Sequence, residues 1–196
     1  ALFKGALGSP RDMLAAIQTF QSTGDVAAIY AAIYPFTESL VAATPYILAG
    51  LAVAIGFRCG LFNIGAEGQL FIGALGSAYV GYSIVGLPGY IHLPLAMLAG
   101  AVAGAIWAAI PGYLKARFGA HEVVNTIMMN WIAFRLGDWL LFGPMKASGY
   151  RPVTPNVEAT AELPHFFPDP LRFNWGFVFA LAMAALVYWF LFKTTL

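Results

Sequence analysis

The feature that most constrains this sequence is the length of its uncharged stretches. From Gly68 to Leu114 the chain contains no Asp, Glu, Lys or Arg, and Ser39 to Phe57 is uncharged between Glu38 and Arg58. A helix needs about 20 mostly apolar residues to cross the hydrocarbon layer of a membrane. Only 10% of the residues are charged and the mean hydropathy is +0.75, whereas soluble domains carry about 25% charged residues. The chain is therefore predicted to be integrated in a membrane.

The arrangement of these stretches predicts an all-α, polytopic transmembrane helix bundle of about five spans. Glycine and proline at 86–89 divide the longest uncharged run, as a turn would. The predicted spans are 39–57, 69–85, 93–114, 123–142 and 173–192. Four of them fall within residues 38–142 and the fifth within 173–196. The segment 143–172 holds six prolines, so it is predicted to be a loop without a long helix.

The first 37 residues are predicted to form short amphipathic helices outside the spans. Met13, Leu14, Ile17 and Phe20 recur at helical spacing. Asp25 is a candidate N-cap for a further helix, which would run to Tyr34 before Pro35. Lys and Arg lie near span ends on both sides, so the positive-inside rule leaves the orientation of the chain nearly undecided.

A polar stretch between the first two predicted spans, Phe62–Gln69, interrupts the apolar pattern. Asn63, Glu67 and Gln69 lie there among glycines. One interpretation is a helix broken near residues 58–69, at Gly65 and Gly68, whose polar groups face a cavity or a neighbouring helix, since buried charges in membranes are functional sites by default. The other interpretation is an ordinary turn with Glu67 solvated near the start of the next helix, where the helix dipole favours an acid. Spacing alone leaves both open.

A second polar group lies on the fourth predicted span. Glu122, Thr126 and Asn130 recur every four residues, so they share one face of a helix, with Asn125 beside them. Such a stripe lines a pathway or makes hydrogen bonds between helices. Arg135 and Asp138 project towards the opposite face and are predicted to form a structural ion pair, which lowers the cost of burying either charge.

Small residues form a stripe on the third predicted span, at Gly100, Gly104, Ala108 and Gly112. In lipid, helices associate through close packing, so this stripe predicts a site where another helix approaches.

Several function classes are not supported. The three histidines, at 92, 121 and 165, are isolated, and no metal-ligand spacing or catalytic arrangement stands out. Cys59 is the only cysteine, so no disulfide can form within the chain. A net charge of +1 without a basic cluster argues against a nucleic-acid partner. We therefore expect a non-enzymatic membrane protein without catalytic residues or a metal.

Three stretches of the sequence together resemble those of a known protein family. The stretches Gly60–Gln69 and His121–Asn130, preceded by Thr44–Ala54, resemble the permease subunits of nucleoside and simple-sugar ABC importers. These belong with the ribose and branched-chain amino-acid importer permeases. The resemblance extends over nearly the whole chain.

The resemblance implies a multi-pass subunit in the cytoplasmic (inner) membrane of a bacterium or archaeon. Its partners would be cytoplasmic ATP-binding subunits, a second permease subunit, an extracytoplasmic solute-binding protein and membrane lipid. The chain itself would hold no cofactor, and ATP and magnesium would bind the separate ATPase. Residues 1–37 and 143–172 would be extracytoplasmic, with Lys115 and Arg117 cytoplasmic. A first span before Ala1 and a coupling helix after Leu196 would complete the subunit.

The implied activity is transport of a small polar solute, most simply a nucleoside, by alternating access. The residues expected to line or gate the pathway are Asn63, Glu67, Gln69, Glu122, Asn125 and Asn130. A sugar or branched-chain amino-acid permease of the same superfamily is the nearest alternative. An energy-independent channel or secondary transporter, and a non-transporting scaffold, are alternatives from other classes.

Overall fold

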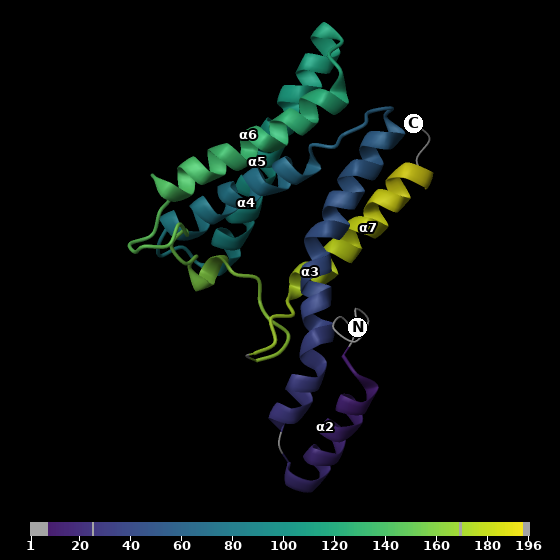
Figure 1. Ribbon diagram of the computed structural model, residues 1–196, viewed down its shortest axis with the longest axis vertical. Helices are drawn as coiled ribbons and strands as arrows, with labels where there is room; N and C mark the ends of the chain where they lie inside the picture. Colours follow the sequence, from purple (N-terminus) through teal and green to yellow (C-terminus); the bar gives the residue numbers. More distant parts are fainter. Residues whose placement is uncertain (1–7, 25, 169, 194–196) are drawn as a thin grey trace. The chain divides into compact units, whose positions relative to one another are not determined.

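The computed structural model of the protein describes residues 8–24, 26–168 and 170–193. Within these ranges the fold is all-α, as predicted, and contains no β-strand; its nearest approach to one is an isolated bridge between His165 and Asn174. Figure 1 shows the helices in chain order. They are α2 (Pro10–Thr23), α3 (Val26–Arg58), α4 (Ala66–Ser83), α5 (Gly89–Phe118), α6 (Glu122–Phe142), the short 3-10 helix η1 (Ala159–Ala161) and α7 (Trp175–Lys193).

Three of the described helices are long and apolar enough to cross a membrane: α3, α5 and α7. The helices α4 and α6 match two further predicted spans in position, but they are shorter or more polar and do not reach the same hydropathy. Among the described residues between α6 and α7 the only helix is η1, in agreement with the many prolines of this segment. The multi-pass membrane fold predicted from the uncharged stretches is confirmed, and three of the predicted spans coincide with α3, α5 and α7.

The helix that starts after residue 25 is longer than predicted. Asp25 itself, the expected cap, lies outside the described residues. The expectation that this helix ends before Pro35 is wrong, because α3 continues through Pro35 and Pro45 to Arg58. Proline lacks the N–H that bonds to the carbonyl four residues earlier, so Pro35 leaves the Ala31 carbonyl without its usual helical donor. Prolines are nevertheless tolerated in membrane helices, where neighbouring groups satisfy the freed backbone atoms.

The chain divides into two compact units, Ala1–Leu48 with Leu163–Leu196, and Ala49–Glu162. In the first unit, the guanidinium of Arg172, just before α7, binds the carboxylate of Glu38 on α3, with Nε to Oε1 at 3.1 Å and a second, ion-paired contact from Nη2 to Oε2. A two-point contact of this kind fixes orientation as well as distance. It joins segments of the unit that are far apart in the sequence.

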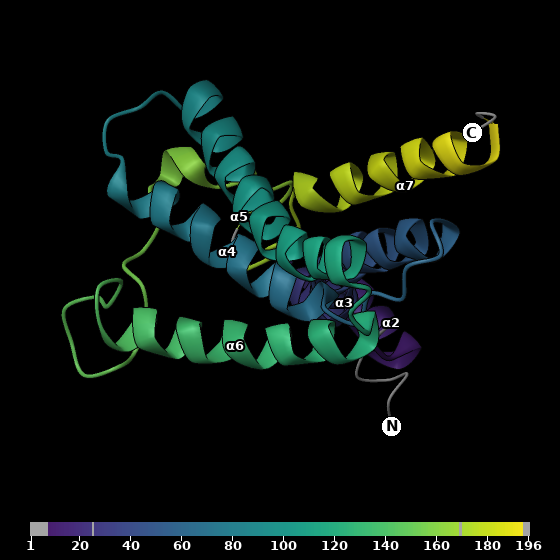
Figure 2. The same ribbon diagram turned by 90° about the horizontal axis from the view of Figure 1, so that it is seen from above.

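The second unit is built around α4, which lies between α5 and α6 (Figure 2). Glycines allow α4 and α5 to touch through their backbones. A Cβ atom on Gly100 would lie 3.0 Å from the Gly73 carbonyl oxygen, and one on Gly104 would lie 3.1 Å from the Gln69 carbonyl oxygen. The predicted small-residue stripe therefore packs against α4 in its first half. The second half differs, because no described atom lies within 4 Å of a Cβ built on Gly112.

The contact between α4 and α6 depends on Gly137. A Cβ atom there would lie only 2.2 Å from Cε1 of the Phe71 ring. The same ring packs edge-on against Phe134, with centroids 5.5 Å apart, and the neighbouring Ala133 of α6 is completely buried. This packing brings the polar face of α6 against the start of α4.

Candidate functional site

The break between α3 and α4 spans residues 59–65, so Gly68 lies inside the first turns of α4 rather than in the break. Asn63 organises this segment. Its Oδ1 accepts a hydrogen bond from the Gly65 N–H at 2.9 Å, and its amide pairs with the amide of Gln69, with Nδ2 to Oε1 at 3.1 Å and Nε2 to Oδ1 at 3.3 Å. An asparagine that bonds to the backbone two residues ahead favours a turn over a continued helix. The two predicted residues Asn63 and Gln69 therefore shape the break together.

Asn130 of α6 holds the break from the other side. Its Oδ1 accepts from the Gly68 N–H at 2.9 Å, and its Nδ2 donates to the Ile64 carbonyl at 3.1 Å. The side chain is buried, and one amide satisfies two backbone groups that the end of the helix leaves unpaired. Asn130 thus fastens α6 to both sides of the helix start.

Two glycines at the start of α4 allow this close approach, and Gly68 is required by it. A Cβ atom on Gly68 would lie 2.7 Å from Asn130 Oδ1 and 3.0 Å from Asn130 Cα, and one on Gly65 would lie 3.1 Å from the Thr126 Cβ. Gly65 has φ −77°, so its backbone conformation does not require glycine, and a side chain there would press on Asn63 and Thr126. The glycine pattern reflects the proximity of α6.

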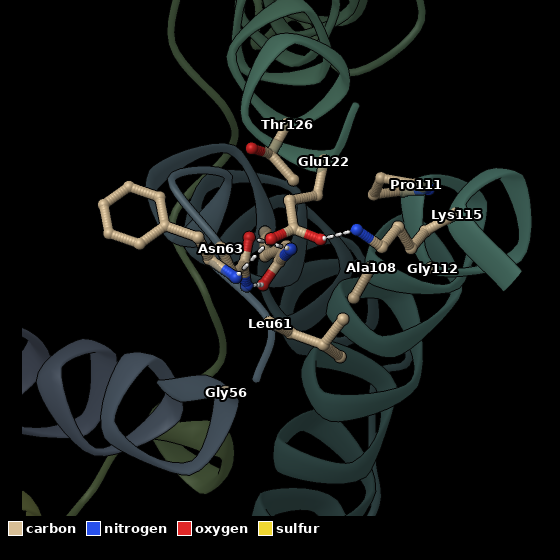
Figure 3. Close-up of a pocket in the computed structure, with 11 residues that line it drawn as sticks. Gly56, Leu61, Asn63, Ala108, Pro111, Gly112, Lys115, Glu122 and Thr126 are labelled. Carbon is tan, nitrogen blue, oxygen red and sulfur yellow. Dashed lines mark hydrogen bonds and ion pairs between the residues drawn. The ribbon is translucent and has the colours of Figure 1, made fainter. Parts of the chain in front are cut away.

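Glu122 begins α6 and ties it to two other elements. Its Oε1 accepts from the Phe62 N–H of the break at 3.1 Å, and its Oε2 lies 2.5 Å from the ammonium Nζ of Lys115 on α5 (Figure 3). The pKa of Glu122 is held below its usual range, mainly by the hydrogen bond from Lys115 and to a smaller extent by the one from the Phe62 N–H. The negative carboxylate therefore bridges the break and the end of α5.

The end of α5 brings Lys115 into place. Gly119 adopts φ +64°, in the left-handed region that favours glycine. Its N–H donates to the Lys115 carbonyl at 3.0 Å, and the Ala120 N–H reaches the Leu114 carbonyl at 3.4 Å. The Gly119 to Lys115 bond is that of the αL motif, which commonly ends helices. The chain reverses within a few residues, so that Glu122 returns beside Lys115.

A cavity of about 200 Å³ opens between these groups. Figure 3 shows Glu122 and Lys115 meeting at one side of it and Asn63 at another. Small residues on α3 and α5 leave the space free, since Ala108 and Gly112 occupy positions where a larger side chain would project into it. Its lining consists of Gly56, Leu61, Phe62, Asn63, Gln69, Ala108, Pro111, Gly112, Lys115, Glu122 and Thr126.

Two of the predicted site residues stand apart from these bonds. Glu67 lies in the first turn of α4 and is exposed, and no hydrogen bond or ion pair involving it is found among the described residues. Asn125 is half-buried, and its Nδ2 is buried without a hydrogen-bond partner among the described residues. The structure thus brings Asn63 and Gln69 together with Glu122 and Asn130, while Glu67 and Asn125 keep polar atoms free.

Arg135 and Asp138 form an ion pair on α6, with Nη1 and Oδ2 3.6 Å apart. Their side chains are 80% and 58% exposed. They lie on the side of α6 opposite to its buried residues, which include Asn130 and Ala133.

Sequence reasoning missed the partners of two further polar residues. The sequence indicates only the orientation of Lys115, although its separation from Glu122 by one tight turn is a signal for pairing. His92 looked isolated, yet it is fully buried: Nε2 donates to the Val80 carbonyl at 3.2 Å, and Nδ1 meets the Thr160 hydroxyl at 2.7 Å. A polar side chain in an apolar span needs such partners. The part of the chain that is described contains no group of three or more His, Cys, Asp or Glu side chains able to hold a metal ion.

Together, the apolar helices define a multi-pass membrane protein, and a cluster of hydrogen-bonded polar groups lies at its helix interruption. Comparison with known proteins then gives the family. The model of the branched-chain amino acid transport system permease component matches residues 36–196, and the chain belongs to this family.

Three curated relatives are similar to this chain. The guanosine ABC transporter permease protein NupP of Bacillus subtilis is 43% identical over 83% of this chain and 47% of its own length. The glucose ABC transporter permease protein TsgB13 of Haloferax volcanii is 45% identical over 67% of this chain and 34% of its own length. The nucleoside ABC transporter permease protein NupB of Lactococcus lactis is 36% identical over 53% of this chain and 29% of its own length. The chain spans less than half the length of these relatives, and no solved structure matches it to a comparable degree.

Proposed function

We propose that this chain belongs to the membrane-spanning permease subunit of an ATP-driven importer and that the solute is a nucleoside. The observation that carries the proposal is the 43% identity to a guanosine permease over 83% of the chain. A second relative named for nucleosides supports the same solute class. Transport of a sugar is the second candidate, favoured by the 45% identity to a glucose permease over a shorter stretch.

The partners follow from this assignment. A permease of an ATP-driven importer works with cytoplasmic ATP-binding subunits, a second permease subunit and an extracytoplasmic solute-binding protein. ATP and magnesium belong to the ATP-binding subunits, and this chain holds no cofactor of its own. The subunit lies in the cytoplasmic membrane, with Lys115 and Arg117 on the cytoplasmic side and residues 1–37 and 143–172 outside.

The bonds around the break support a division of roles among the proposed pathway residues. Asn63, Gln69 and Asn130 use their amides on one another or on the backbone, so they position the break. Glu67 and Asn125 keep polar atoms free, and free donors and acceptors are what a polar solute needs along its path. We assign these two residues to contact with the solute.

Glu122 has a gating role in this proposal. It binds α5 through Lys115 and the break through the Phe62 N–H, so a shift of α6 must either carry both elements along or break one of the bonds. Two discrete arrangements of such a network are what alternating access requires. Nucleotide binding by the ATP-binding subunits would bias these two arrangements.

The test is uptake by the complete importer reconstituted in vesicles. Labelled guanosine should accumulate only with active ATP-binding subunits, and unlabelled nucleosides should compete, whereas ribose and branched-chain amino acids should not. Competition by glucose alone would favour the sugar candidate. Uptake that persists after the ATPase is inactivated would refute an ATP-driven importer and favour a channel or secondary transporter.

A further inference from the structure

The side chain of Asn130 takes the place of one backbone hydrogen bond of α4. In a continued helix the Gly68 N–H would donate to the carbonyl four residues earlier, which is that of Ile64. Here both groups bond to the Asn130 amide instead: the Gly68 N–H donates to Oδ1 at 2.9 Å, and Nδ2 donates to the Ile64 carbonyl at 3.1 Å. The next bond, from the Gln69 N–H to the Gly65 carbonyl, is direct, at 3.1 Å. A side chain of α6 is thus inserted at the point where the helical ladder of α4 begins.

The backbone contacts between α4 and α5 follow a regular register. A Cβ atom on Gly100 would meet the Gly73 carbonyl, and one on Gly104 would meet the Gln69 carbonyl. The helices are antiparallel here, because four residues forward on α5 correspond to four residues back on α4. Each step of four residues returns to the same face of both helices, so the register predicts where a longer α4 would lie.

The next two steps of this register fall on the break and on the cavity. They would set Gly65 beside Ala108 and Leu61 beside Gly112. Ala108, Gly112 and Leu61 line the cavity of about 200 Å³ (Figure 3), and no described atom lies within 4 Å of a Cβ built on Gly112. Small residues let a helix backbone approach closely in a membrane. The cavity therefore occupies the place where one more turn of α4 would pack.

The end of α3 limits how far α4 could extend. Gly60 adopts φ +72°, and its N–H donates to the Phe57 carbonyl at 3.1 Å, while the Leu61 N–H donates to the Gly56 carbonyl at 2.9 Å. These two bonds form a Schellman motif, which ends α3. An extension of α4 is therefore confined to residues 61–65, which is little more than one turn and about 7 Å along the helix axis.

We propose that α4 has a second state in which residues 61–65 form an added helical turn within the cavity, and that the Asn130 amide holds α4 in the broken state. When α6 withdraws, the Gly68 N–H and the Ile64 carbonyl pair directly and the turn packs against Ala108 and Gly112. The inference rests on the proposed function for its trigger, which is nucleotide binding by the ATP-binding subunits. It identifies the second arrangement that alternating access needs, with the cavity closed.

The two states exchange one set of hydrogen bonds for another. In the broken state the Phe62 N–H donates to Glu122 at 3.1 Å, and the Gly65 N–H donates to Asn63 at 2.9 Å. The extended state gives up both bonds and gains helical bonds and packing against α5. Because bonds are also lost, removal of the Asn130 amide lowers stability even where the helix extends. A movement of α6 that withdraws this amide shifts the balance between the two states.

The first test is disulfide formation between Leu61→Cys and Gly112→Cys in the complete importer in its membrane. Cys59, the only cysteine of the chain, is replaced by serine so that it does not compete. A disulfide needs Cα atoms within about 7 Å, which the added turn provides. Adding Asn130→Ala leaves the two backbone groups of α4 only each other, so the disulfide should form about tenfold faster.

The matched control for Asn130→Ala is Thr126→Ala, one turn away on the same face of α6. The Thr126 hydroxyl bonds within its own helix, to the Val123 carbonyl at 3.2 Å, so its removal leaves the ladder of α4 untouched. The rate of disulfide formation should stay that of the cysteine pair alone. Equal rates in the Asn130→Ala and Thr126→Ala variants would overturn the proposal.

The second test locks the broken state with Ala66→Pro. Ala66 is the first residue of α4, where proline is favoured because its missing N–H has no partner within the helix. In the extended helix the same proline would lack the bond to the Phe62 carbonyl and would clash with it. Added to the cysteine pair with Asn130→Ala, it should return disulfide formation to the slow rate. A rate that stayed high would overturn the proposal.

The same lock acts in the otherwise unaltered importer, so the proposal stays testable if Asn130→Ala does not fold. Ala66→Pro should lower ATP-driven guanosine uptake at least about tenfold, because the closed arrangement becomes inaccessible. The matched control is Gly89→Pro, a proline at the first residue of α5, which should leave uptake unchanged. Uptake by Ala66→Pro equal to that of Gly89→Pro would overturn the proposal.

Guanosine uptake by the unaltered importer keeps the two hypotheses apart. Uptake together with equal disulfide rates in the Asn130→Ala and Thr126→Ala variants would refute only the extension of α4. Faster disulfide formation without guanosine uptake would refute the nucleoside assignment and leave the extension standing.

Discussion

Replacing Gly68 by alanine tests the central claim about the site, that α6 approaches the start of α4 too closely for any side chain. The added methyl carbon would lie 2.7 Å from Asn130 Oδ1, 3.0 Å from Asn130 Cα and 3.2 Å from the Ala133 Cβ. Two of these three atoms belong to the α6 backbone or its Cβ and cannot move without the helix. Helix α6 must therefore shift, or the Gly68 N–H must lose its bond to Asn130.

The expected loss of stability follows from three terms. Overpacking of this kind costs about 1–3 kcal/mol, and weakening the hydrogen bond costs about 1 kcal/mol more. Alanine gains about 0.5–1 kcal/mol over glycine through its better helix propensity. The net destabilisation is about 1–3 kcal/mol, and each kcal/mol lowers the melting temperature of a chain of this size by about 2–4 °C.

The assay is thermal unfolding of the purified permease in nanodiscs, followed by tryptophan fluorescence, with Gly50→Ala as the matched control. Gly50 lies within α3, and no described atom is within 4 Å of a Cβ built there. That variant should be as stable as the native protein or more stable by about 0.5–1 kcal/mol. If Gly68→Ala also melted at or above the native temperature, the proposed close approach of α6 would be wrong.

Three further predictions concern the groups around the break. Asn130→Ala should lower stability by about 1–3 kcal/mol for each backbone group left unpaired, because the Gly68 N–H and the Ile64 carbonyl both lose their bond to the Asn130 amide; a melting temperature equal to that of the native protein would contradict these two hydrogen bonds. Lys115 lowers the pKa of Glu122 in the folded protein. The ionised Glu122 carboxylate therefore stabilises the fold fully above the pKa that it has in the unfolded chain, and this contribution is lost as pH falls through the lower pKa of the folded state. In the Glu122→Gln variant, the melting temperature should therefore fall less steeply as the pH is lowered. An unchanged acid side of the curve would show that Glu122 does not contribute to the pH dependence of stability. Gly112→Leu should fill the cavity and reduce nucleoside uptake without lowering the melting temperature, since no described atom lies within 4 Å of its Cβ position; undiminished uptake would show that the cavity is not on the path.

The sequence by itself determined the class of fold. An uncharged stretch long enough to span a membrane is expected to form a membrane helix. Its apolar side chains are stable in lipid, and its backbone groups bond within the helix. Turn residues at 86–89 located the division between α4 and α5 correctly. The prediction that the helix ends before Pro35 is wrong, because α3 continues through this proline for 33 residues in all, and a rule based on neighbouring residues does not count the length of a membrane helix.

The sequence also marked most of the polar residues of the site, but not their partners. Helical spacing places Glu122, Thr126 and Asn130 on one face of their own helix, and it carries no information about which helix that face meets. The bond from Asn130 to Gly68 joins residues 62 positions apart, and the bond from Glu122 to the Phe62 N–H joins residues 60 apart. Only packing brings such pairs together.

Tertiary structure therefore decided the roles that spacing left open. It placed Gly68 against α6 and left the neighbouring Glu67 exposed, although both lie in the same polar stretch. It showed why glycine is required at 68, because Asn130 of α6 occupies the space where a side chain would be, and why the space at 65 is tight. Sequence limits which residues are able to hydrogen-bond or pack closely, and the fold selects the partner, since these interactions act only over a few ångströms.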